Sequence, residues 1–435
     1  MTFQAPTRLV LLAFLLGCLQ TAPSAAQTSS TKHTPALAEA APEAVGMSAE
    51  RIARIDEMLK QAVEAENIPG AVALVARGGK IVYWKAHGTG DQQTGKALAR
   101  DAIFRIASQS KAITSTAVMM LWEEGRFQLD DPISRYIPEF ADPQVLEEFD
   151  PADTTFTTMV ASREITIRHL LTHSSGLGYG VIDGDERFRM MYAKAGITDL
   201  FTTEDISIRE SVLKLAKLPL HHNPGEGFTY SEGLDVLGYF VEVISGQPFD
   251  VFLEARIFKP LGMTDTAFYL PAAKAGRLVR VQQKGESGWE RYPVTFYDPQ
   301  YPVTGARRFF SGGAGLSSTA LDYATFLQMY INGGELGGVR ILSRTTIAAM
   351  MQNQVDDLWG DNEYGLAFGL LTEEASARGG RGSAGTFDWG GYFNTQYFAD
   401  PEEGIVAILM KQTQGPVQDQ TSWKFRLLVG AAVDD

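Results

Sequence analysis

Ser108 and Lys111 form a Ser-x-x-Lys pair near the start of FRIASQSKAITSTAVMMLWEEG, residues 104–125. A serine hydroxyl becomes a good nucleophile when a base removes its proton, and a lysine amine can be that base where burial disfavours its charged form. Residues three apart on a helix are neighbours, so the amine can reach the hydroxyl. The pair predicts nucleophilic catalysis at Ser108. The alternative interpretation makes Ser108 a helix N-cap and Lys111 a surface lysine.

The same spacing occurs at two other places in the chain, Ser29 with Lys32 and Ser211 with Lys214. The first pair lies in a Ser/Thr/Ala-rich stretch. The second lies in the amphipathic run SVLKLAKL, where we expect the lysines to stay solvated. Only the pair described above follows an extended, buried-looking segment, residues 102–107, and precedes an apolar helix, so it is the candidate that we retain.

Tyr230 is the candidate for a third catalytic group. It ends the loop in PGEGFTYSEGLDVLGYFVE and precedes an apolar helix. A phenol beside an amine can relay a proton between a serine, a lysine and a leaving group. The structural alternative is a loop aromatic that packs on the helix.

Trp389, Gly390 and Gly391 end a β-like run and are followed by Tyr392. Glycines at the end of a strand let a substrate approach the backbone closely. Acyl transfer also needs donors that point at the developing oxyanion. We assign this role to the backbone N–H groups of Ser108 and Tyr392. The structural alternative is a β-bulge with a packed tryptophan.

The elements that must position these residues alternate between strands and helices. The spacing predicts a helix that Ser48 caps, and AVALVARGGKIVYWKAHG predicts a hairpin that turns at Gly78-Gly79. Residues 108–271 are mostly helical in pattern. Further elements are expected near residues 320–332 (helix), 343–352 (helix), 364–371 (strand), 384–389 (strand), 395–400 (strand), 405–411 (strand) and 417–433 (helix).

This order of elements predicts an α/β (α+β) fold. Its mainly antiparallel sheet is formed by the N- and C-terminal parts of the chain and is flanked by helices. The region of about residues 108–271 is expected as a mostly helical subdomain, inserted in the α/β part of one domain that spans residues 46–435.

The pattern of the N-terminal residues predicts an export signal. Arg8 precedes the apolar run LVLLAFLLGCL, and small residues follow as far as Ala26. This order is typical of a signal peptide, residues 1–26, and predicts a periplasmic or extracellular protein with a flexible leader at residues 27–45. Leu15-Leu16-Gly17-Cys18 also resembles a lipobox, so lipid anchoring through Cys18 is the alternative.

Composition and charge exclude several classes of partner. The net charge of -14 argues against nucleic acid and anionic membrane surfaces, which require basic patches. No apolar run is long enough for an integral membrane span, which takes about 20 residues. His169 and His173 lie four apart, but the glutamate of the metalloprotease pattern is missing, so we read both as structural and expect no metal site. The oligomeric state stays open.

Six ordered segments resemble the serine β-lactamase-like family, which includes class C β-lactamases, D-alanyl-D-alanine carboxypeptidases and family VIII carboxylesterases. They are FRIASQSK, HLLTHSSGL, NPGEGFTYSEGLDVLGY, PLGMTDTAF, SGGAGLSSTALDYATF and FDWGGYFNTQYFADPEEG. The resemblance runs from about Val45 to the C-terminus. It implies that Ser108 is acylated, that Lys111 and Tyr230 act as base and proton relay, and that Trp389-Gly390-Gly391 borders the site. It implies no cofactor.

Two departures from the lactamase pattern favour a neutral substrate. Glu232 stands where the lactamases have asparagine, and Trp389 stands where they have the lysine that would pair with a β-lactam carboxylate. Trp-Gly-Gly resembles the family VIII esterases. We therefore expect a serine hydrolase that acts on small-molecule esters or amides, most of all a carboxylesterase for short acyl chains. The alternatives are a β-lactamase or D-amino-acid peptidase and, from another class, a non-hydrolysing penicillin-binding sensor or assembly module.

Overall fold

The computed structural model describes all residues except 2–28, 380 and 416–418. Its centre is a nine-stranded sheet in which neighbouring strands are antiparallel, apart from the parallel pair β1–β3. The expected fold class, an antiparallel sheet flanked by helices, is confirmed. In spatial order the strands are β1 (Ala38–Glu39), β3 (Lys80–Asp91), β2 (Gly70–Arg77), β17 (Ile405–Met410), β16 (Gln396–Asp400), β15 (Phe387–Gly390), β14 (Gly369–Leu370) and β13 (Glu363–Tyr364), with β4 (Lys96–Ala97) beside β3.

Pairing of β2 with β17 joins the two ends of the chain. Residues 72–77 run antiparallel to residues 405–410 with no break in register, and both strands are almost completely buried. The hairpin β2–β3 turns at Gly78 and Gly79, with φ of 55° and 77°. Two consecutive positive φ values match the type I′ turn that suits the twist of a hairpin, and glycine adopts them without strain.

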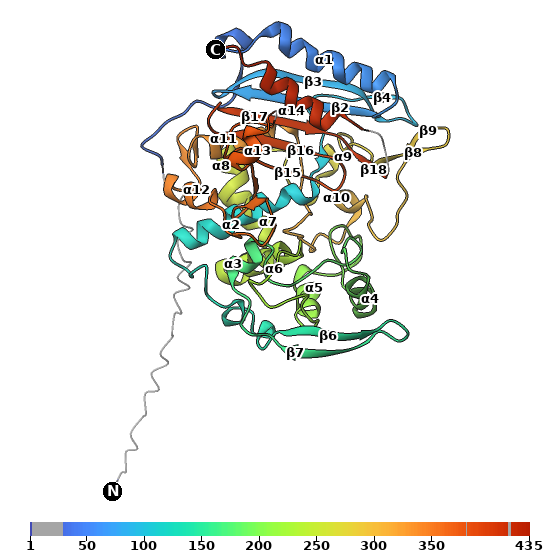
Figure 1. The fold of residues 1–435 in the computed structure, drawn as a ribbon, viewed down its shortest axis with the longest axis vertical. Coiled ribbons are helices and arrows are strands. Elements are labelled where there is room, and N and C mark those ends of the chain that lie inside the picture. Colours follow the sequence, from blue (N-terminus) through green and yellow to red (C-terminus); the bar gives the residue numbers. More distant parts are fainter. Residues whose placement is uncertain (2–28, 380, 416–418) are drawn as a thin grey trace.

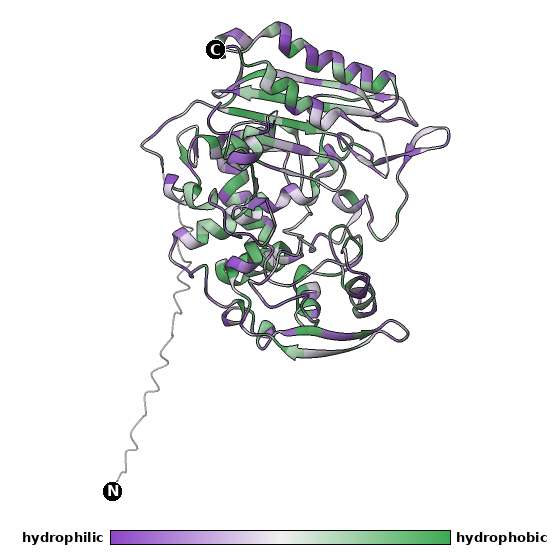
Figure 2. Cartoon of the chain, viewed as in Figure 1, coloured by the Kyte–Doolittle hydropathy of each residue, from purple (hydrophilic) through white to green (hydrophobic). Residues whose placement is uncertain are grey.

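Helices α1 (Ala49–Glu64) and α14 (Thr421–Ala431) lie together over one face of the sheet (Figure 1). Ser48 caps α1, as expected, because its side chain accepts a hydrogen bond from the N–H of Arg51. Ile55 and Leu59 of α1 are fully buried against the sheet, whereas the outer side of the helix is hydrophilic (Figure 2). The two helices and this face of the sheet therefore enclose a hydrophobic layer.

The opposite face of the sheet carries the larger core and the helical region. Helix α2 (Ser110–Glu123) runs through the middle of the molecule, between the sheet and the region that contains α3 to α6 (Figure 1). The other helices are α3 (Ile167–Leu171), α4 (Glu186–Ala195), α5 (Ile208–Leu215), α6 (Gly233–Ser245), α7 (Phe249–Leu253), α8 (Lys259–Leu261), α9 (Ala272–Ala275), α10 (Tyr301–Thr304), α11 (Ala320–Ile331), α12 (Arg344–Met350) and α13 (Glu373–Ala377).

Short strand pairs complete the fold, and one of them departs from expectation. The helical region contains a long hairpin, β6 (Gln144–Asp150) with β7 (Thr155–Val160), that projects from the end of the molecule (Figure 1). Two-residue alternation is weak in this polar stretch, so its pattern did not indicate strands. The remaining pairs are β5 (Phe104–Arg105) with β10 (Ser317–Ser318), β11 (Glu335–Leu336) with β12 (Val339–Arg340), and β8 (Gln282–Gly285) with β9 (Gly288–Arg291) and β18 (Thr413–Gln414).

Part of the predicted flexible leader has regular structure. Strand β1 pairs with β3, and a 3-10 turn covers Pro42–Val45. The predicted signal peptide and Cys18 lie outside the described residues. Within the described part of the chain, no single helix is both long and apolar enough to cross a bilayer; only the bent pair formed by residues 233–245 and 249–261 meets the length and composition of a span.

Candidate active site

Ser108 lies in a tight turn between a short strand and a buried helix. The chain leaves β5, makes a 3-10 turn over Ala107–Gln109 and enters α2 at Ser110. Ala107 is fully buried and has φ of 46°, in the left-handed region that non-glycine residues rarely adopt. Such backbone conformations persist only where the surroundings enforce them, and they cluster at active sites. The turn therefore holds Ser108 in a defined place.

Lys111 lies one helical turn further on and points its amine at Ser108. Its side chain is buried, with 1% of its surface exposed. Nζ donates hydrogen bonds to Ser108 Oγ at 3.2 Å, to Tyr179 OH at 2.9 Å and to the carbonyl of Gly313 at 2.8 Å. An ammonium has three donors, so these partners satisfy all of them.

The other two Ser-x-x-Lys pairs have different surroundings. Lys32 and Lys214 are exposed, and their amines donate to the backbone carbonyls of Asn332 and Gly196. The hydroxyl of Ser211 donates to the carbonyl of Thr198. Burial and mutual contact thus distinguish the pair at 108 and 111 from its repeats, as the apolar character of the following helix suggested.

Tyr179 was missed by sequence reasoning, although its hydroxyl is in direct contact with Lys111. Burial, and after it the neighbouring Tyr230, raises the pKa of the Tyr179 phenol well above its usual value, so the hydroxyl stays neutral. Tyr179 follows directly on HLLTHSSGLG, and no spacing rule connects it to Ser108. Only the path of the glycine-rich loop through the helical region brings it to the site.

Tyr230 also lies beside the amine, and its ring contacts that of Tyr179, with the centroids 5.4 Å apart. Lys111 Nζ is 4.6 Å from the centroid of the Tyr230 ring, and the indole Nε1 of Trp389 donates to the Tyr230 hydroxyl at 3.4 Å. The buried ring of His173 supports this turn, because its Nδ1 accepts a hydrogen bond from the N–H of Ser231 at 3.2 Å. The structure therefore brings Ser108, Lys111, Tyr230 and Trp389 together.

The end of β15 packs directly against the turn that carries Ser108. A side chain at Gly391 would place Cβ 2.4 Å from the carbonyl oxygen of Ile106, closer than real Cβ contacts. The hydroxyl of Thr395 also donates to this carbonyl, at 3.4 Å. Glycine at 391 thus permits the backbone leading into Tyr392 to lie beside the backbone leading into Ser108. This is the juxtaposition that the two predicted oxyanion donors require.

Aromatic side chains form a wall around Trp389. Its indole lies against the rings of Tyr230, Tyr364 and Trp359, with centroids 5.8, 5.3 and 6.1 Å apart. Phe228 stacks on Trp359 at 4.7 Å. The wall presents an apolar surface with few polar groups, which suits an uncharged acyl or alcohol group better than an anion.

Three buried carboxyl groups lie behind the lysine. They belong to Asp199, Glu232 and Asp235, none more than 9% exposed. Burial, and then the charge of Asp235, raises the pKa of Asp199 to about 7. Burial and the neighbouring acids raise the pKa of Glu232 well above its usual value, and burial raises that of Asp235. These three carboxyls therefore stay protonated, and uncharged, to a higher pH than exposed carboxyls do.

The histidines singled out in the sequence have structural contacts. His169 Nδ1 accepts a hydrogen bond from the N–H of Thr166, the helix N-cap of α3. Burial, and after it Lys111, holds the pKa of His173 well below its usual value, so its ring is neutral. Among the described residues, no group of three or more His, Cys, Asp or Glu side chains is arranged to hold a metal ion.

Comparison with known proteins identifies the class to which this fold and site belong. The family model described as Beta-lactamase matches residues 55–431, so the chain belongs to the β-lactamase family. It is 32% identical to esterase EstB of Burkholderia gladioli over 83% of this chain and 90% of that protein. It is 30% identical to lovastatin esterase of Penicillium rubens over 83% of this chain and 93% of that protein.

Comparison with a solved structure supports the same family assignment. EstCE1, a hydrolase with promiscuous acyltransferase activity, superimposes with a TM-score of 0.73 at 26% identity over 88% of this chain and 98% of that chain. The resemblance predicted from the six sequence segments is confirmed. The protein is a serine hydrolase with the fold of the β-lactamases.

The buried carboxyls predict a pH dependence of stability. The raised pKa means that the folded state binds the Asp199 proton more tightly than the unfolded state. The resulting stabilisation is complete below the ordinary pKa of 3.8 and is lost as the pH rises through about 7. We expect Asp199→Asn, which cannot ionise, to reduce the loss of unfolding free energy between about pH 5 and about pH 8 by roughly 1 to 3 kcal/mol, measured by urea denaturation.

Asp361→Asn is the matched control, because Asp361 is exposed. This variant should reproduce the pH profile of the wild type. Parallel profiles for the wild type and Asp199→Asn would contradict the prediction.

Proposed function

We propose that the protein is a carboxylesterase that hydrolyses short-chain esters through an acyl-enzyme on Ser108. The observation that carries this proposal is the contact of a fully buried lysine amine with the hydroxyl of Ser108, at 3.2 Å, beside an aromatic wall. The names of two relatives, esterase EstB and lovastatin esterase, support ester hydrolysis as the activity.

The first half of the reaction forms the acyl-enzyme. Ser108 Oγ attacks the ester carbonyl while the amine of Lys111 accepts the hydroxyl proton. The backbone N–H groups of Ser108 and Tyr392 stabilise the negative charge on the carbonyl oxygen. The proton then passes to the leaving alcohol, with Tyr230 as relay. The C–O bond of the ester breaks and the acyl group remains on Ser108.

The second half releases the acid. Water attacks the acyl carbonyl and gives a proton to the same Lys111 and Tyr230 pair, and Ser108 Oγ leaves with a proton returned by that pair. Tyr179 and the carbonyl of Gly313 hold Nζ in place through both halves, because each accepts a hydrogen bond from it. Tyr179 therefore acts as a positioning residue in this mechanism.

The charges around the site favour an ester over a β-lactam. A β-lactam carries a carboxylate, which in this site would meet the aromatic Trp389 in place of a cation. A neutral ester adds no charge to this environment. Turnover of β-lactams or D-alanyl peptides is the alternative, and a stable, non-hydrolysed lactam adduct would indicate a sensor.

Substitution at the reacting pair tests the mechanism directly. We expect Ser108→Ala and Lys111→Met each to lower kcat for p-nitrophenyl butyrate by about 10³-fold or more, because each removes a member of one catalytic unit. Initial rates at saturating substrate provide the measurement.

Two controls match these variants. Ser115→Ala removes a buried hydroxyl that has no hydrogen-bond partner among the described residues, and Lys214→Met removes an exposed lysine from another Ser-x-x-Lys pair. Both should keep kcat within about twofold. Undiminished turnover by Ser108→Ala would remove the proposed nucleophile.

The role of Tyr179 has its own test. We expect Tyr179→Phe to lower kcat by about 10- to 100-fold with KM little changed, because the amine loses an anchor that orients it rather than a substrate contact.

Tyr301→Phe removes an equally buried hydroxyl that donates to the carbonyl of Phe309, and serves as control. If both tyrosine variants lower kcat equally, or if Tyr179→Phe changes KM as much as kcat, Tyr179 does not act by orienting the amine.

Trp389 is expected to set the preference for neutral substrates. Trp389→Lys should lower kcat/KM for p-nitrophenyl butyrate by about tenfold or more and raise the ratio of nitrocefin to ester turnover, because it exchanges an apolar surface for a cation. Trp423→Lys, at an exposed tryptophan on α14, is the control. An unchanged ratio in Trp389→Lys would assign the preference to other residues.

A further inference from the structure

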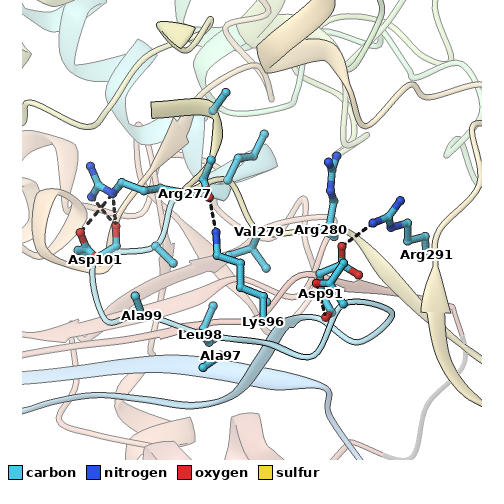
Figure 3. A pocket seen from close by; sticks show the side chains of 16 residues that line it. Asp91, Lys96, Ala97, Leu98, Ala99, Asp101, Arg277, Val279, Arg280 and Arg291 are labelled. Atoms are coloured by element: carbon cyan, nitrogen blue, oxygen red, sulfur yellow. Dashed lines mark hydrogen bonds and ion pairs between the residues drawn. The ribbon is translucent and has the colours of Figure 1, made fainter. Parts of the chain in front are cut away.

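A cavity of about 340 Å³ lies apart from the site of Ser108 (Figure 3). One wall is formed by residues 94–102, which include β4, and the other by residues 275–280, with Arg291 of β9 at one end. The volume lies within the usual range of small-molecule pockets. None of Ser108, Lys111, Tyr179, Tyr230 and Trp389 lines it.

The charged groups around this cavity are predominantly cationic. Lys96, Arg277, Arg280 and Arg291 line it, against two carboxyls. Arg291 Nη2 forms an ion pair with Asp91 at 2.6 Å, as Figure 3 shows. Arg277 forms ion pairs with Asp101, at the opposite end of the view, and with Asp265. These ion pairs account for both carboxyls of the lining.

Among the described residues, neither Arg280 nor Lys96 forms an ion pair with a carboxylate, although Arg280 contributes to the lowered pKa of Asp91. In the part of the chain that the structure describes, the guanidinium of Arg280 has one hydrogen bond, from Nη1 to the amide oxygen of Gln300 at 3.2 Å. Lys96 Nζ donates to the carbonyl of Gly276 at 2.6 Å. A guanidinium has five donors, so most of those of Arg280 remain free for a ligand. The positive charge here also contributes, after burial, to a lowered pKa at the buried Arg105.

The rest of the lining is apolar. Ala97, Leu98 and Ala99 follow one another along the wall next to β3 in Figure 3, and Val279 faces the cavity from the other wall. A ligand that fits this lining combines one anionic group with a hydrocarbon body. Inorganic anions would leave the apolar wall unused.

The two walls are held to each other by backbone hydrogen bonds, so the cavity has a defined shape. The N–H of Ile103 donates to the carbonyl of Arg277, and the N–H of Val279 donates to the carbonyl of Ile103, both at 2.9 Å. The buried guanidinium of Arg105 adds a bond to the carbonyl of Val279 at 2.9 Å. A preformed cavity avoids the entropy cost of ordering its walls on binding.

We propose that this cavity binds a small organic carboxylate. The free guanidinium donors of Arg280 receive the carboxylate, since this planar fork matches carboxylate geometry, and Lys96 adds a second positive charge. Leu98 and Val279 contact the hydrocarbon body. The proposal does not depend on the mechanism at Ser108, because the two sites share none of these residues.

Ligand binding to the purified full-length protein tests the assignment, with benzoate as the probe and benzyl alcohol as its neutral counterpart. Isothermal titration should show saturable benzoate binding that is at least tenfold tighter than that of benzyl alcohol and weakens as salt is added. Arg280→Gln should weaken benzoate binding about tenfold or more, and Lys96→Gln about threefold. Arg54→Gln, at an exposed arginine of α1 paired with Glu50, should leave it unchanged.

Ala99→Glu provides a second variant, because Ala99 is exposed and an added carboxylate there should repel the ligand without disturbing the core. Far-ultraviolet circular dichroism of each variant reports that it is folded. Equal binding of benzoate by the wild type and Arg280→Gln would overturn the proposal, as would equal affinity for benzyl alcohol. Tighter binding of inorganic phosphate than of benzoate would overturn the carboxylate assignment.

Discussion

Burial of the Lys111 amine is the constraint on which the rest of the site depends. A charged or polar nitrogen in a protein interior is costly unless every donor has a partner. The three partners of Nζ come from the turn before α2, from the loop at Tyr179 and from the loop at Gly313. These segments are far apart in the chain, so the same hydrogen bonds that satisfy the lysine also fix the helical region against the sheet.

The site also depends on two places where the backbone approaches a neighbouring group closely, at Gly313 and at Gly391. A Cβ at Gly313 would lie 2.5 Å from Asp235 Oδ2, and one at Gly391 would lie 2.4 Å from the carbonyl oxygen of Ile106. Both glycines therefore admit contacts that any side chain would block. The first lets a carbonyl reach the lysine, and the second brings the end of β15 beside the turn of Ser108. The main sheet supplies a rigid base for both arrangements, because β15 is paired on both sides.

Charge and surface character distinguish the site of Ser108 from the cavity beside β4. Around Ser108, an aromatic wall lies beside a single buried lysine, which suits neutral ligands. The cavity beside β4 has the opposite character, with two cations that lack a carboxylate partner in the described chain and an apolar wall. Both follow the same rule, that a ligand is favoured when it completes the charges and hydrogen bonds that the protein leaves open.

Much of this protein could be predicted from local patterns. The glycine pair at 78 and 79, the Ser48 cap and the apolar helix after Ser108 each act through neighbouring residues, so they predicted the hairpin, α1 and α2. Six motifs predicted the family. The hairpin β6–β7, Tyr179 and the cavity at Arg280 had no such signal. Tyr179 lies 68 residues from Lys111 in the chain, and Arg280 lines a cavity with Lys96, so only tertiary packing decides these contacts. Local sequence determines which elements form, whereas the partners of a buried amine or a free guanidinium depend on how distant elements meet.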